Sequence, residues 1–132
     1  MIVTEELEAI ESLWKTGLED AFRAYQPATV NLGEAEAPRV ALAAALVEVA
    51  LALQRLGRPA PPPPDLLRGD LCLARASRLL ADTRDTRLQV SFARAIEEQS
   101  AAAAAERELG PTRSRLLRAI EEATPAARSE TR

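Results

Sequence analysis

The stretch VALAAALVEVALAL, residues 40–53, constrains the fold more than any other part of the chain, because Glu48 is its only charged residue. Ala and Leu dominate the stretch, and both are strong helix formers. A helix that is apolar on nearly every side has to be buried. The run is well short of the roughly 20 apolar residues that cross a bilayer, and Arg39 and Arg55 close its ends. It therefore predicts a central core helix around which other helices pack.

The segments on either side of this run show the periodicity of amphipathic helices, with apolar side chains every three or four positions. Hydrophobic residues make up 47% of the chain but aromatic residues only 3%, so Ala and Leu must supply most of the core. We expect an all-α bundle of about five helices, over residues 4–25, 37–56, 66–82, 86–109 and 112–123. Residues 1–123 would form one domain, and residues 124–132 a disordered polar tail.

Proline and glycine predict where these helices end. Pro27 and Gly33 are expected to terminate the first helix, since proline disfavours helix in the residue before it and glycine tolerates positive φ. The run RLGRPAPPPPD, residues 55–65, carries five prolines that favour an extended polyproline II strut. Asp65 then offers an N-cap for the next helix.

Composition excludes several classes of function. The chain has no histidine, which removes the commonest general base and a common metal ligand. We expect no zinc site, no Ser-His or Cys-His catalysis and no cofactor. The net charge is −3 and the arginines are interspersed with acids, so no nucleic-acid partner is expected. Acidic residues near the start (Glu5, Glu6 and Glu8) and the lack of a long apolar span predict a cytoplasmic protein without a transmembrane segment.

Several polar residues are candidate ligands, and for each a structural role is favoured. Neighbouring acids such as Glu97 and Glu98 diverge by about 100° on a helix and are expected to face solvent. Asp82 and Asp85 are spaced to hold Mg²⁺ in principle, but helix capping is the favoured role. Asp70 falls among apolar positions of its helix, so we expect a structural polar residue with a hydrogen-bond partner.

Two further features have both a functional and a plain interpretation. Cys72, the only cysteine, is expected to be a packing residue or an interface thiol. Arg58, Pro61 and Pro64 match the R-x-x-P-x-x-P pattern of SH3 ligands, although a connector between two helices is the favoured interpretation.

The sequence LLRGDLCLARASRLLADTRDTRLQVSFARAIEEQSAAAAAE, residues 66–106, resembles the middle of the all-α trans-prenyl diphosphate synthases. Gly69 and Asp70 fall on the Gly-Asp of that family's GDYLLARAFELLA-like helix, and LARASRLLAD follows the same helix. The preceding LVEVALALQRLG is similar to the family's helix that leads into its first aspartate-rich motif, DDxxD. The resemblance implies a helical fold similar to part of the isoprenoid synthase fold.

The catalytic motifs of that family are missing from this sequence. Aligning Glu48 with the corresponding glutamate puts Arg58 and Pro59 where the paired aspartates should stand. GEAEAPRVAL has no counterpart of the family's GGKRxRP stretch, and no second DDxxD occurs in the sequence. Without Mg²⁺-binding carboxylates the allylic diphosphate has no metal clamp. We therefore expect no prenyl transfer by this chain alone.

What the resemblance implies is a short non-catalytic relative, similar to the small subunits of two-component hexaprenyl or heptaprenyl diphosphate synthases of isoprenoid and menaquinone biosynthesis. The expected partner is a catalytic synthase subunit that binds the Mg²⁺, in a heterodimer or heterotetramer. The chain would complete the partner's fold and set product chain length or ease product release. In that family the helices corresponding to residues 66–82 and 86–109 form the subunit interface. The expected interface residues are Leu71, Cys72, Leu73, Leu80, Leu88, Phe92, Ile96 and Ala103.

The sequence is also compatible with a protein of another class. A helical bundle that self-associates or acts as an adaptor, with the proline run as a peptide ligand, has no link to prenyl transfer. An enzyme with an unrecognised site is the least favoured alternative, because the chain has no histidine and no converging carboxylates are evident.

Overall fold

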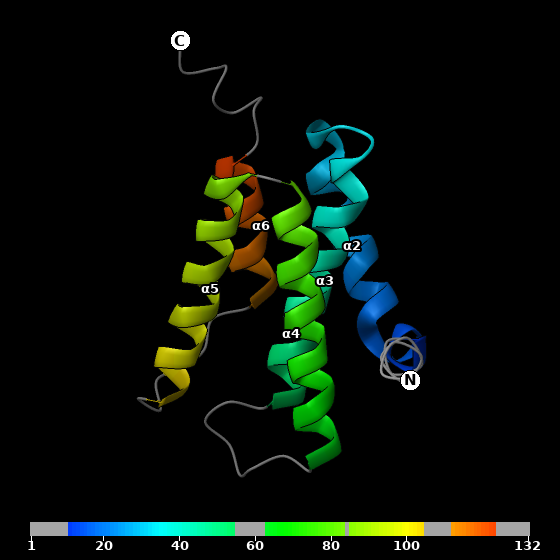
Figure 1. The fold of residues 1–132 in the computed structure, drawn as a ribbon, viewed down its shortest axis with the longest axis vertical. Coiled ribbons are helices and arrows are strands. Elements are labelled where there is room, and N and C mark those ends of the chain that lie inside the picture. The colour runs from blue at the N-terminus through cyan, green and yellow to red at the C-terminus, as the bar shows by residue number, and fades with distance from the viewer. Residues whose placement is uncertain (1–10, 55–62, 84, 105–111, 124–132) are drawn as a thin grey trace.

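Helices make up all the regular structure of the computed structural model, which describes residues 11–54, 63–83, 85–104 and 112–123 (Figure 1). A π-helical turn (η1, Trp14–Leu18) leads into α2 (Glu19–Thr29) and a 3₁₀ turn (η2, Val30–Leu32), followed by α3 (Glu36–Gln54), α4 (Pro63–Thr83), α5 (Thr86–Ala104) and α6 (Thr112–Ala123). No strand occurs in the described ranges, so the all-α prediction is confirmed.

The central position predicted for the apolar run is confirmed in α3. This helix contacts α2, α4 and α6, and Figure 1 shows it behind α4, between α2 and α6. Its fully buried residues are mostly alanines: Val40, Ala41, Ala43, Ala44, Ala45, Leu46, Val47 and Ala50. These small side chains let the neighbouring backbones approach closely. Among the described helices, none is long and apolar enough to cross a lipid bilayer.

Of the remaining helices, α2 and α4 pack on the central helix, whereas α5 and α6 pair with each other. α4 packs mainly against α3, and α5 packs mainly against α6. The pair α5–α6 is antiparallel (Figure 1). The apolar residues that these three helices bury are Cys72, Ala76 and Leu80 of α4, Leu88, Phe92 and Ala95 of α5, and Leu116, Ala119, Ile120 and Ala123 of α6. Gly69 of α4 is also buried.

The predicted first helix differs from the structure in two ways. A π-helical turn interrupts it at Trp14–Leu18, where Gly17 has φ +142°, a value that side-chain-bearing residues rarely adopt. The helix also does not stop before Pro27, because α2 continues through this residue to Thr29. Pro27 lies in the last turn, so its missing N–H removes only one hydrogen bond near the helix end. The predicted break at Gly33 is confirmed, with φ +101°.

The proline run is partly helical, which corrects the predicted strut. Pro63 and Pro64 form the first turn of α4 rather than an extended segment. The first N–H groups of a helix have no intrahelical partner, so proline is tolerated there. Asp65 accordingly lies within the first turn and is not the N-cap. The predictions for residues 1–10, 55–62, 105–109 and 124–132 lie outside the described residues.

Candidate functional site: a Tyr–Glu–Arg network beside an apolar groove

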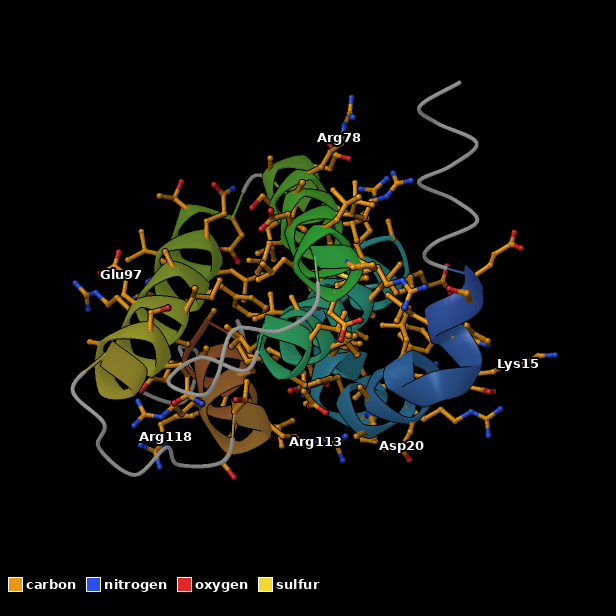
Figure 2. All side chains as sticks on the ribbon, turned by 90° about the horizontal axis from the view of Figure 1, so that it is seen from below. Lys15, Asp20, Arg78, Glu97, Arg113 and Arg118 are labelled. Carbon is orange, nitrogen blue, oxygen red and sulfur yellow. The ribbon has the colours of Figure 1, made fainter. Side chains whose placement is uncertain are left out.

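The only carboxylate of the central run organises a polar network between three helices. Glu48 of α3 accepts a hydrogen bond from the Tyr25 hydroxyl of α2, with 2.8 Å between the oxygens. Arg113 of α6 donates to the same carboxylate twice, from Nε to Oε1 at 3.0 Å and from Nη2 to Oε2 at 2.8 Å. Its Nη2 also lies 3.3 Å from Oδ2 of Asp20. Figure 2 shows Arg113 and Asp20 next to each other, where α6 faces α2.

Burial and charge fix the protonation of this network. Tyr25 is completely buried, and this desolvation together with the hydrogen bond to Glu48 raises the pKa of its hydroxyl far above the usual range. The hydrogen bond to Glu48 also raises the pKa of Arg113. Tyr25 is therefore a neutral donor and Arg113 a permanent cation. This arrangement joins the three helices through charge-assisted hydrogen bonds.

The sequence pattern did not identify this network. Tyr25 and Arg113 lie in two different amphipathic segments, and no spacing pattern links either of them to Glu48. The available signal was Glu48 itself, because one carboxylate in an otherwise apolar helix needs a cation or hydrogen-bond donors. Which residues would supply them depends on how α2 and α6 pack on α3.

An apolar groove of about 490 Å³ opens beside the network. It is lined by Leu13, Gly17, Asp20, Glu48, Val49, Ala52, Leu53, Asp65 and Arg68. All three of its carboxylates have an arginine partner. Arg113 pairs with Asp20 and Glu48, and Arg68 Nη1 lies 3.8 Å from Oδ1 of Asp65. The groove therefore combines apolar walls with charge-paired acids, a surface better suited to apolar atoms than to a cation.

The structure places the predicted interface residues in two different environments. Those with 6% exposure or less belong to the chain's own core: Cys72, Leu80, Leu88 and Phe92. Packing within the chain therefore accounts for their apolar character. Leu71, Leu73 and Ile96 are partly exposed, and the side chain of Ala103 lies outside the described residues. The interface itself stays a prediction.

Asp70 and Cys72 occupy opposite environments on α4. Asp70 is exposed, so its place among apolar positions of the helix does not bury it, and its expected structural role stays a prediction. Leu66, which lies one turn earlier on the same face of α4, is itself 39% exposed. Cys72 is fully buried, as a packing residue would be, and this burial raises the pKa of its thiol to about 11. A thiol with so high a pKa is a poor nucleophile at neutral pH.

The remaining acidic candidates have structural positions. Asp85 accepts a hydrogen bond from the Leu88 N–H at 3.1 Å, so the predicted capping of α5 is confirmed. Glu97 and Glu98 are exposed, as the helical spacing predicts. Within the described ranges, no group of three or more His, Cys, Asp or Glu residues is arranged to hold a metal ion.

Comparisons with known proteins return no relative of this chain. No family model, no curated protein and no solved structure matches it.

Proposed function

We propose that this protein is a non-catalytic helical subunit that pairs with a catalytic trans-prenyl diphosphate synthase subunit. The observation that carries the proposal is the position of the exposed apolar side chains. Among the described residues, four large hydrophobic side chains are exposed, and three of them, Leu66, Leu67 and Val90, lie on α4 and α5. These two helices contain the sequence that resembles the synthase family, in which the corresponding helices meet the partner subunit.

The geometry of α4 gives this surface a defined side. Leu67 is 61% exposed, and Leu71, one turn later on the same face, is partly exposed. The opposite face of α4 carries Cys72 and Ala76, which are buried against the bundle. α4 therefore has an inner apolar face that the chain covers itself and an outer face with leucines available to a partner. Exposed apolar side chains of this kind favour protein–protein contact.

The chemistry of the polar residues supports a structural contribution rather than a catalytic one. Tyr25 holds its proton against Glu48, the Cys72 thiol is buried, and the acids of the apolar groove are paired with arginine. The expected contribution to the complex is shape: the subunit completes the partner's helical layer and limits or eases the passage of a long apolar product.

Co-expression with a catalytic prenyl diphosphate synthase subunit from the same organism tests the proposal. We expect one complex in size-exclusion chromatography and a product chain length that differs from that of the catalytic subunit alone. Leu67→Glu and Leu71→Glu should each weaken the complex while leaving the fold intact. Ser77→Glu is the matched control, because Ser77 is an exposed polar residue on the same helix. Phe92 is unsuitable for this purpose, because it is 1% exposed and a charge there would unfold the chain.

A self-associating bundle is the second candidate function, and the exposed leucines of α4 are compatible with it. Self-association predicts a homodimer that Leu67→Glu dissociates and that does not exchange with a synthase subunit. Separate elution of the two proteins, together with an unchanged product, would eliminate the synthase-subunit proposal.

A further inference from the structure

The two helices of the α5–α6 pair contain the same pentapeptide. Residues 94–98 and residues 118–122 both read RAIEE. The alanines of the two copies have similar environments, since Ala95 is 6% exposed and Ala119 is 5% exposed, whereas Ile120 is fully buried and Ile96 only partly. The arginines and glutamates of both copies are exposed. The two copies therefore present the same sequence of side chains on the outside of the pair.

The contacts between α5 and α6 set these copies at the same level. Gln99 Nε2 lies 2.7 Å from Thr112 Oγ1, and Arg115 Nη1 lies 2.6 Å from Glu98 Oε1. In an antiparallel pair, the direction toward the N-terminus of α5 is the direction toward the C-terminus of α6. Arg94 lies five residues before Gln99 and four residues before Glu98. The same counts forward from Thr112 and Arg115 reach residues 117 and 119, so Arg94 is level with the turn that carries Arg118. The positions of Arg94 and Arg118 thus lie at one level of the pair.

Both arginines line one groove between the helices, with a volume of about 500 Å³. Its walls are formed by Ser91, Arg94, Ala95 and Glu98 of α5 and by Ser114, Arg115, Arg118, Ala119 and Glu122 of α6. Figure 2 shows Arg118 on the side of α6 that faces α5, whereas Arg113 points the other way, toward Asp20. The groove and the Tyr–Glu–Arg network therefore lie on opposite sides of α6.

The charges of this groove do not balance. Three arginines face two glutamates, and Arg115 already pairs with Glu98. Arg115 lies three residues before the RAIEE copy of α6, and the residue three positions before the copy of α5 is Ser91. Glu122 therefore has no arginine at the position from which Arg115 pairs with Glu98. Within the described ranges, no carboxylate oxygen lies within 4.0 Å of the Arg94 or Arg118 guanidinium. Two like charges that share a groove repel each other, and an anion between them removes this repulsion.

We propose that the α5–α6 groove binds a phosphate dianion, free or as a monoester, between Arg94 and Arg118. Guanidinium groups donate paired hydrogen bonds that match the geometry of phosphate oxygens. The Ser91 and Ser114 hydroxyls line the same groove and add neutral donors. The site is larger than inorganic phosphate requires, so the organic part of a monoester also has room. This site is independent of the proposed synthase partner.

Titration of the isolated protein with inorganic phosphate and with phenyl phosphate, at constant ionic strength, tests the site. We expect saturable binding by calorimetry and a rise in the thermal unfolding midpoint. Each of Arg94→Gln and Arg118→Gln should weaken binding by roughly tenfold or more, since each removes charge-assisted hydrogen bonds. Tighter binding of phenyl phosphate than of inorganic phosphate would identify a monoester as the ligand.

Arg87→Gln is the matched control, because Arg87 is exposed on α5 but does not line the groove. It should leave the affinity for phosphate unchanged. The proposal is overturned if neither phosphate compound binds, or if Arg87→Gln weakens binding as much as the two groove variants do. The glutamine variants alter exposed residues, so their helix content should stay unchanged. Loss of binding with unchanged helix content then reports on the arginine and not on unfolding.

Discussion

Arg113 Nη2 lies 2.8 Å from Oε2 of Glu48, although 65 residues separate the two in the sequence. This contact joins the last described helix, α6, to the centre of the bundle. It also brings a positive charge to Glu48, which is the only carboxylate in the apolar run of α3 and requires a cationic partner. The stability of the protein should therefore depend on this pair more than on any ion pair at its surface.

Removing the cation should show this dependence directly. Arg113→Met leaves the partly buried Glu48 carboxylate without its cationic partner, and we expect the free energy of unfolding to fall by about 1–3 kcal/mol. The double variant with Glu48→Gln should lose less than the sum of the single variants, because the unpaired charge is gone. Urea denaturation measures all three. Arg23→Met is the control, since Arg23 forms an exposed pair with Glu19 and should change stability by less than about 1 kcal/mol.

Tyr25 is the only tyrosine, so the near-ultraviolet absorbance of tyrosinate reports on this residue alone. Its pKa is raised by burial and by Glu48, so the Tyr25 hydroxyl should not titrate near pH 10 in the folded protein. The unfolded chain loses this proton first, at about pH 10. The free energy of unfolding should therefore fall as the pH rises above about 10. Tyr25→Phe should lose about 1 kcal/mol at neutral pH, and its free energy of unfolding should fall less steeply above about pH 10, because the tyrosine contribution is removed. An ordinary titration of the Tyr25 hydroxyl in the folded state would contradict the network.

Capping of α5 by Asp85 can be tested against a neighbouring aspartate. Asp85→Ala removes the acceptor of the Leu88 N–H and should lower the free energy of unfolding by about 1 kcal/mol. Asp82→Ala changes an exposed aspartate near the end of α4, and its effect should stay within about 0.5 kcal/mol. Equal effects of the two substitutions in urea denaturation would show that the hydrogen bond contributes nothing.

The thiol of Cys72 should react slowly while the protein is folded. Burial raises its pKa to about 11, so little thiolate forms at pH 8 and the reagent has no access to the sulfur. We expect a thiol reagent to modify the native protein far more slowly than the protein in urea. Because the folded pKa is above the unfolded value, the free energy of unfolding should also fall as the pH rises from about 8.5 toward 11. Rapid modification of the native protein at pH 8 would contradict the buried position.

The sequence by itself determined the class of fold and the identity of the central helix. Residues 40–53 carry one charge, and only a position inside a bundle buries such a helix on all sides. The cap at Asp85 and the break at Gly33 were also predicted correctly, because a cap or a turn depends on a few adjacent residues. The helical start at Pro63 was missed because the first N–H groups of a helix have no intrahelical partner, so proline is tolerated there. The passage of α2 through Pro27 was missed because the loss of one hydrogen bond in the last turn does not end the helix.

Only the tertiary structure decided which distant residues meet. The sequence pattern indicates that the Glu48 carboxylate requires a cation. The packing of α6 on α2 and α3 determines that Arg113 supplies it. The pentapeptide RAIEE is visible twice in the sequence, yet only the antiparallel register of α5 and α6 brings Arg94 and Arg118 to one level. Helix formation depends on neighbours along the chain, whereas a site depends on contacts that the register and packing of whole helices create.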